Sequence, residues 1–211
     1  MMGKSHLAFN AASAVVVSSM VHVGGETYSW SYLLALLSGH LAFTPVALPS
    51  LLQKGIFYLL VLLGALLPDI DHPGSLLGRR CWFISYPLHR CFGHRSITHS
   101  LLAVLLLAVT CIALGSTGIA LYSSQGASVS PVLLNTLHLA LFSLLFGYIM
   151  HLLADSLTKE GIPLLWPYEK RYGLLPFTSL RFRTGTWVEY LLLWSFIFCI
   201  GVGFGTGNFS F

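Results

Sequence analysis

Two long apolar runs constrain this chain more than any other feature of its sequence. Residues 97–122 and 132–153 contain no Asp, Glu, Lys or Arg, and each exceeds the roughly 20 apolar residues that a helix needs to cross a bilayer. Of the 211 residues, 55% are hydrophobic and 9% are charged, whereas a soluble domain carries about 25% charged residues. The composition excludes a soluble globule, and the length excludes a large multidomain enzyme. We expect one integral-membrane domain covering residues 1–211.

Shorter apolar segments predict further helices on both sides of these runs. Residues 188–209 predict a third span, with Glu189 near its start. Residues 7–23 and 55–67 would cross outward and back, with residues 30–52 between them as a hairpin or re-entrant helix. The predicted fold is all-α, a polytopic membrane helical bundle of about four to five spans. Two irregular polar loops on one side of it would form a His/Asp site.

Two polar segments, residues 68–96 and 154–187, hold nine of the eleven basic residues. Since two predicted spans separate them, both segments emerge on the same side of the membrane. Loops rich in Lys and Arg face the cytoplasm, and the opposite loop, residues 123–131, carries no charge. The sequence therefore predicts a multi-pass protein with both segments at the cytoplasmic side. Its basic residues are not interleaved with stacking aromatics, so no nucleic-acid partner is expected.

The first polar segment opens with Asp69, Asp71 and His72, directly after an apolar stretch. Pro68 and Pro73 bracket these residues, and prolines at both ends predict an extended conformation. Alternate side chains of an extended segment share a face, so the two aspartates would point together. Two carboxylates that close are poorly tolerated unless a cation lies between them.

A second cluster, His94, Arg95 and His99, lies where the first apolar run opens. Ser96 is expected to cap that helix, which places His99 in its first turn. His94 would lie in the preceding loop, and the helix start would let the two histidines converge. Because the helix dipole disfavours a cation at an N-terminus, a metal ion there would need the nearby carboxylates.

The third cluster is the pair His151 and Asp155, at the end of the second run. Their i, i+4 spacing places both side chains on one helical face, a common way for a helix to offer two metal ligands. Gly147, one turn earlier, would let a neighbouring helix approach closely. A simpler alternative is that such polar groups bind headgroups or water, or cap helices. The gathering of acids and imidazoles at one membrane depth favours metal binding. The remaining histidines are interpreted as packing or surface residues: His22, His40, His89 and His138.

At these clusters the chain resembles the YdjM-type family of bacterial inner-membrane proteins. The most specific matches are the runs 92–95 and 98–102, and Gly161 with the run 163–167. Family members are described as metal-dependent hydrolases, under LexA control in some bacteria. Residues 30–55 are longer than the family leads us to expect, which leaves the path of residues 24–67 open. The resemblance assigns to a metal site the residues His6, Asp69, Asp71, His72, His94, His99, His151, Asp155 and Glu189.

The expected cofactor is a divalent metal, zinc where histidines dominate and manganese or magnesium where carboxylates do. Nine candidate ligands exceed those of one tetrahedral zinc, so either two ions bind or several residues orient the ligands; we favour two ions. A metal-activated water would attack a phosphoester or ester of a lipid or lipid-linked substrate. Arg95 would hold a phosphate oxygen or, equally, anchor a helix end at the headgroups. The expected catalytic residues are Asp71, His94, Arg95 and Asp155.

Two other functions stay open at the level of sequence. One is a metal-handling membrane protein whose clusters line a transport path. Transport needs polar groups through the whole hydrophobic thickness, whereas the cores of the two runs offer only His138, Asn135 and a few hydroxyls. The other is a non-catalytic membrane anchor that recruits a cytoplasmic regulator through its basic loops. The expected partners are membrane lipid and a lipid or phosphoester substrate, and the oligomeric state is left open.

Overall fold

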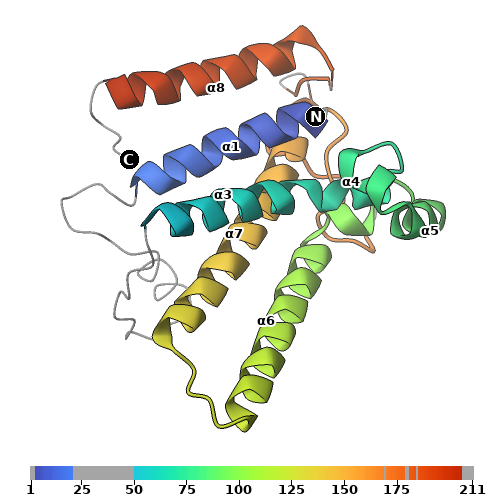
Figure 1. Cartoon of the computed structure of the whole chain (residues 1–211). Helices are drawn as coiled ribbons and strands as arrows, with labels where there is room; N and C mark the ends of the chain where they lie inside the picture. The colour runs from blue at the N-terminus through green and yellow to red at the C-terminus, as the bar shows by residue number, and fades with distance from the viewer. Residues whose placement is uncertain (1–2, 21–49, 169, 179–180, 184, 206–211) are drawn as a thin grey trace.

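The computed structural model describes residues 3–20, 50–168, 170–178, 181–183 and 185–205, and the regular structure in these ranges is helical (Figure 1). The only β-type pairings among them are two isolated bridges, Thr158 with Phe182 and Ile162 with Tyr172. The predicted all-α fold is confirmed. The long helices are α1 (Gly3–Met20), α3 (Ser50–Leu66), α6 (Leu101–Ser124), α7 (Pro131–Ser156) and α8 (Trp187–Gly205). The short ones are η1 (Pro68–Asp71), α4 (Leu76–Arg80), α5 (Trp82–Phe92) and η2 (Ile97–His99).

Helices α6 and α7 form a hairpin and coincide with the two apolar runs. Within the described residues they are the two helices whose length and hydropathy suit a membrane crossing. Each begins at a serine whose hydroxyl accepts a backbone N–H in the first turn, Ser100 for α6 and Ser130 for α7. Pro131 suits the first position of α7 because that N–H has no helical partner. The number of further spans stays a prediction.

Helix α3 packs closely along α7, and glycines permit this approach. A Cβ atom at Gly147 would lie 2.0 Å from the carbonyl oxygen of Val61, and one at Gly64 would lie 2.1 Å from that of Leu144. The predicted role of Gly147 in close helix packing is confirmed. A small core is buried beside this contact, made by Ala14, Phe57, Val61 and Leu139 from α1, α3 and α7.

The long helices bring one end of each to the same part of the molecule. The starts of α1, α6 and α8 and the ends of α3 and α7 gather there (Figure 1). Helix α1 lies between α3 and α8, and its first residues reach the end of α7. The predicted hairpin at residues 30–52, together with His22 and His40, lies outside the described residues.

Two local predictions are wrong. Residues 68–71 are not extended but form the 3-10 turn η1, because Pro68 fits the first position of a helix and the turn continues directly from α3. Ser96 does not cap α6: its hydroxyl donates to the Gly93 carbonyl, and Ser100 is the cap. Residues 97–99 therefore form the separate turn η2 before α6 begins.

Candidate metal centre

Helix α7 supplies two of the central side chains, His151 and Asp155. Both are fully buried, and His151 Nε2 lies 3.7 Å from Asp155 Oδ2. The other imidazole nitrogen of His151, Nδ1, donates to the carbonyl oxygen of Ala65 at 2.6 Å. This bond leaves the Nε2 lone pair directed at the neighbouring carboxylates, the tautomer that metal-binding histidines use.

The turn η2 supplies His99, which is also fully buried. Its Nε2 lies 3.4 Å from Asp155 Oδ2, and its Nδ1 lies 3.0 Å from the Thr98 hydroxyl. The carbonyl of Thr98 accepts a hydrogen bond from the Tyr148 hydroxyl at 2.5 Å, which fixes η2 against α7. Burial lowers the pKa of His99, but the carboxylates of Asp155 and Asp71 outweigh it and raise this pKa to about 9.

The turn η1 supplies Asp69, the fourth member of what we call the four-residue cluster, Asp69, His99, His151 and Asp155. Asp69 Oδ1 lies 3.6 Å from His151 Nε2 and 3.9 Å from His99 Nε2. Neither of these Nε2 atoms has a hydrogen-bond partner in the described part of the chain, although both are buried. Buried polar atoms without partners are costly, so a converging set of them indicates a ligand that completes the site.

His6 reaches this site from the start of α1. Its Nε2 lies 3.1 Å from Asp155 Oδ1, and its ring stacks on the ring of His151 at a centroid distance of 3.8 Å. The donor atoms form two groups that could each hold an ion, His6 with His151 and Asp155, and Asp69 with His99 and His151. Helix α1 thus runs away from the site and α3 returns to it, as the predicted path requires.

Asp71 belongs to neither donor group, so the structure does not place it with Asp69 at one candidate ion. In a 3-10 turn, unlike an extended segment, residues i and i+2 do not share a face. Asp71 Oδ1 accepts from His94 Nδ1 at 2.8 Å, and Oδ2 accepts from the Thr98 hydroxyl at 2.5 Å. Burial raises the pKa of the Asp71 carboxyl, but hydrogen bonds with His94 and His99 outweigh it and hold that pKa well below its usual range.

Arg95 connects the two sides of the site. Its backbone N–H donates to Asp71 Oδ2 at 3.1 Å, and its guanidinium donates to Asp155 Oδ1 at 2.9 Å and to Glu160. The residue is 5% exposed and has φ of 56°, which is uncommon for a residue with a side chain. The guanidinium is thus engaged by carboxylates. Sequence reasoning missed Glu160, because no periodicity relates this loop residue to Arg95.

Three other candidates lie at the edge of the site or beyond it. His72 is exposed, its Nδ1 accepts from the Gly74 N–H at 2.9 Å, and its ring lies 4.8 Å from that of His94. Glu189 is fully buried in the first turn of α8, where its Oε2 accepts from the Gly185 N–H at 2.7 Å. Neither His72 nor Glu189 belongs to the two donor groups. His89, interpreted as a packing or surface residue, is exposed and its Nδ1 donates to the Asp71 carbonyl at 3.1 Å.

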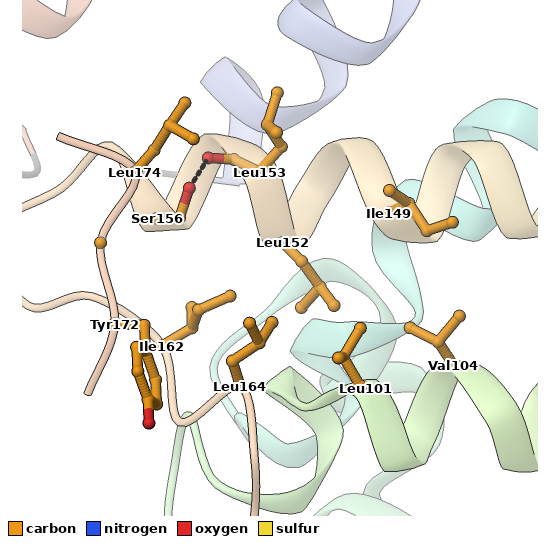
Figure 2. A pocket seen from close by; sticks show the side chains of 11 residues that line it. Leu101, Val104, Ile149, Leu152, Leu153, Ser156, Ile162, Leu164, Tyr172 and Leu174 are labelled. Carbon is orange, nitrogen blue, oxygen red and sulfur yellow. Dashed lines mark hydrogen bonds between the residues drawn. The ribbon is translucent and has the colours of Figure 1, made fainter. Parts of the chain in front are cut away.

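An apolar pocket of about 380 Å³ lies beside α7 (Figure 2). Its lining includes Leu152 and Ser156, the sequence neighbours of His151 and Asp155, so it lies on an adjacent face of the helix. The start of α6 and the loop at residues 162–174 form its other walls. A hydrogen bond from the Leu101 N–H to the Leu164 carbonyl, 3.0 Å long, joins these two walls. The lining side chains of α7 are Ile149, Leu152, Leu153 and Ser156.

Known proteins resemble this chain over most of its length. The family described as YdjM inner membrane protein matches residues 1–207. Inner membrane protein YdjM of Escherichia coli (strain K12) is 44% identical over 113 residues, which make up 54% of this chain and 50% of that protein. The protein of the same name from Shigella flexneri gives the same values. The chain therefore spans about half the length of these two relatives.

A third relative is less similar to this chain. The uncharacterized protein YvsG of Bacillus subtilis (strain 168) is 34% identical over 130 residues, which cover 62% of this chain and 66% of that protein. No solved structure matches the chain significantly.

Proposed function

The chain belongs to the YdjM inner membrane protein family, and on that premise we propose that it is a metal-dependent hydrolase of the bacterial inner membrane. The proposal rests on one observation, the convergence of the four-residue cluster. The relatives are named as inner membrane proteins, and helices α6 and α7 suit a membrane crossing. The catalytic activity is our inference from the chemistry of the buried side chains.

The distances between the imidazole nitrogens and the carboxylate oxygens of the cluster are close to the ligand spacing of a tetrahedral zinc site. Ligand atoms of zinc lie about 2.0–2.1 Å from the ion, so two neighbouring ligands of a tetrahedron are roughly 3.4 Å apart. The four distances between an imidazole Nε2 and a carboxylate oxygen in the cluster are 3.4, 3.6, 3.7 and 3.9 Å. An octahedral magnesium site would bring neighbouring ligands to about 3.0 Å. Two imidazoles with two carboxylates therefore favour zinc over magnesium.

A second ion would take His6 and Asp155 from the other donor group, because Nδ1 of His151 is held by Ala65 and its Nε2 can bind one ion only. With a single ion, His6 would instead orient Asp155 through the bond to Oδ1 and leave Oδ2 for the metal. Metal analysis distinguishes the two arrangements, because it counts the ions per chain.

Hydrolysis needs proton transfer near the metal, and His94 is placed for it. A bound divalent ion would supply Lewis-acid activation of water and of a substrate oxygen. The buried Asp71 carboxylate accepts the Nδ1–H of His94 and fixes its tautomer, which leaves Nε2 to take up or deliver a proton. The His94 ring lies 5.5 Å from the ring of His99 and its side chain is 31% exposed, so it borders both the cluster and solvent.

We propose a lipid or lipid-linked phosphoester or ester as the substrate, approached from the cytoplasmic side. The apolar pocket between α6, α7 and the loop at 162–174 supports this choice, since it could accommodate an acyl chain beside the cluster (Figure 2). The basic residues of the two polar segments support the cytoplasmic side.

The test is metal analysis of the detergent-purified protein, with His151→Ala and with His138→Ala as a matched control. His138 lies on the same helix, thirteen residues from His151, and lines a different pocket. We expect zinc in the wild type and the control and its loss in His151→Ala. Hydrolysis of phospholipid vesicles should then follow metal content and stop with chelator. A wild-type protein without bound metal would contradict the proposed metal-dependent hydrolase. A wild-type protein that contains metal but forms no metal-dependent product from the vesicles would contradict the proposed lipid substrate.

A further inference from the structure

The helix α5 exposes large apolar side chains next to the candidate metal centre. Trp82 is 68% exposed, Phe83 61%, Tyr86 57% and Ile84 40%. Ser85 is the one α5 residue that is buried. A helix on a water-facing surface would carry polar side chains at such positions, so this face indicates contact with something apolar.

Arginines accompany these side chains, and no acid does. Arg79 and Arg80 end the preceding helix α4, and Arg90 lies in the last turn of α5. All three are exposed, and residues 72–92 contain no Asp or Glu. Aromatic and aliphatic side chains combined with exposed positive charge are typical of helices that lie in the interface of an anionic membrane. We call this feature the α4–α5 surface: Arg79, Arg80, Trp82, Phe83, Ile84, Tyr86 and Arg90.

The α4–α5 surface lies at the end of the molecule where a bilayer surface is expected. It connects η1 to η2, directly before the start of α6, one of the two helices suited to span the membrane. The ring of Phe92, at the end of α5, meets the Trp166 ring edge-on at 6.0 Å. Tryptophan is frequent at membrane interfaces, so this contact is consistent with both α5 and the loop of Trp166 lying at the depth of the membrane interface.

We propose that the α4–α5 surface lies in the headgroup region of the bilayer, with its aromatic side chains among the upper acyl chains and its arginines on lipid phosphates. The partner is anionic lipid, which matches the charge of the three arginines and the apolar character of the four large side chains. This inference is independent of the proposed hydrolase activity. It has one consequence for the site, because α5 also holds η1 through the bond from His89 Nδ1 to the Asp71 carbonyl.

The experiment uses the full chain in vesicles of phosphatidylcholine and phosphatidylglycerol, with no other protein. Phe83→Cys, in a background without the four native cysteines, carries an environment-sensitive fluorophore. Leu114→Cys, which replaces an α6 residue that is 69% exposed, is the reference for membrane depth, and the free fluorophore–cysteine conjugate is the aqueous reference. We expect iodide to quench the label at 83 at least about threefold less than the free conjugate. A lipid with a nitroxide near the headgroup should quench the label at 83 more than one with a deep nitroxide, and Leu114→Cys should show the reverse.

The proposal would be overturned if iodide quenched the label at position 83 as strongly as the free conjugate and nitroxide lipids did not quench it. That result would favour a protein partner for this surface. If Phe83→Cys does not fold, brominated lipid serves with native tryptophan. The wild type should then lose a larger share of its emission than Trp82→Phe, and equal losses would count against the proposal. Replacing Arg79, Arg80 and Arg90 by Gln should raise iodide access in vesicles with phosphatidylglycerol, and no change there would exclude the phosphate contacts.

Discussion

Each central imidazole of the four-residue cluster has one nitrogen held by the protein and the other facing the carboxylates. For His151 the holding group is the Ala65 carbonyl, and for His99 it is the Thr98 hydroxyl. The Thr98 hydroxyl in turn donates to Asp71, so a buried chain of hydrogen bonds sets the orientation of His99. A site built in this way is pre-organised for a cation before one binds.

The first residue-level prediction concerns pH. His99 has a pKa of about 9 in the metal-free protein, because the carboxylates outweigh burial, and it must lose its proton to bind a metal. Below that pH, metal and proton compete, so metal affinity should rise about tenfold per pH unit between roughly pH 6 and 9 and level off above. Titration calorimetry at pH 7 in two buffers of different ionisation heat should show proton release on binding. A metal affinity that does not change with pH would mean that His99 is not a ligand of the metal.

The second concerns the Asp71–His94 pair. Removing a group that transfers protons typically lowers the rate about 10²–10⁴-fold, so His94→Gln should lose activity by that order while it keeps its metal. His72→Gln is the matched control, since its exposed ring lies 4.8 Å from that of His94 and belongs to neither donor group. Metal content and turnover of both variants are measured on the same preparations. Loss of metal in His94→Gln would make His94 a ligand, and unchanged turnover would exclude it from proton transfer.

Sequence reasoning identified the chemistry of these residues better than their pairing. His151 and Asp155 could be placed together because helical spacing alone puts them on one face. Asp69 and Asp71 could not be separated, because their directions depend on the 3-10 turn of η1. The left-handed backbone of Arg95 and its contact with Glu160 depend on tertiary contacts between distant segments, which leave no local pattern.

At the scale of elements, the packing of α3 against α7 is the most sensitive contact. Since Cβ atoms at Gly147 and Gly64 would lie 2.0 and 2.1 Å from backbone oxygens of the other helix, Gly147→Ala should force the helices apart. Overpacking of this kind costs about 1–3 kcal/mol or more of unfolding free energy. Gly118→Ala on α6 is the control, because its Cβ would meet nothing within 4 Å. Thermal unfolding in detergent should show a lower Tm for the first variant and an unchanged Tm for the control; equal Tm values would contradict the close approach.

Helices could be predicted from the sequence where a long apolar run defines them. The apolar runs at 97–122 and 132–153 differ by a few residues from α6 and α7. Helices α4 and α5 were not expected, because arginines, prolines and aromatics in the polar segment give neither a long apolar run nor a clear alternation. The start of α6 was misplaced because Ser96 and Ser100 are both plausible caps, and the turn at η2 decides between them.

At the scale of the whole molecule, the site joins segments that are distant in sequence. The contact between His6 and Asp155 spans 149 positions, and η1 and η2 supply the remaining ligands. Topology made this convergence predictable, because polar segments on one side of a membrane can meet. The number of spans was not predictable, since the helices other than α6 and α7 are short or interrupted in hydropathy.

Removing the metal should therefore weaken the whole fold. A ligand that binds only the folded state stabilises it by about 4 kcal/mol when present at a thousand times its Kd. We expect chelator to lower the Tm of the wild type by several degrees and to leave His151→Ala unchanged, because that variant has no metal to lose. Scanning fluorimetry with chelator, followed by zinc addition, measures both effects. If chelator left the Tm of the wild type unchanged, the metal would not contribute to the stability of the fold.

Helix α6 has none of its residues buried, yet it directly follows the turn η2, which carries His99. Lipid or detergent must therefore cover much of the apolar surface of α6. Short-chain detergents that solvate apolar surface poorly should let α6 swing away and take the imidazole with it. Preparations would then lose zinc while retaining their helical circular dichroism, and nanodiscs or long-chain maltosides would be the appropriate medium for biochemistry on this protein.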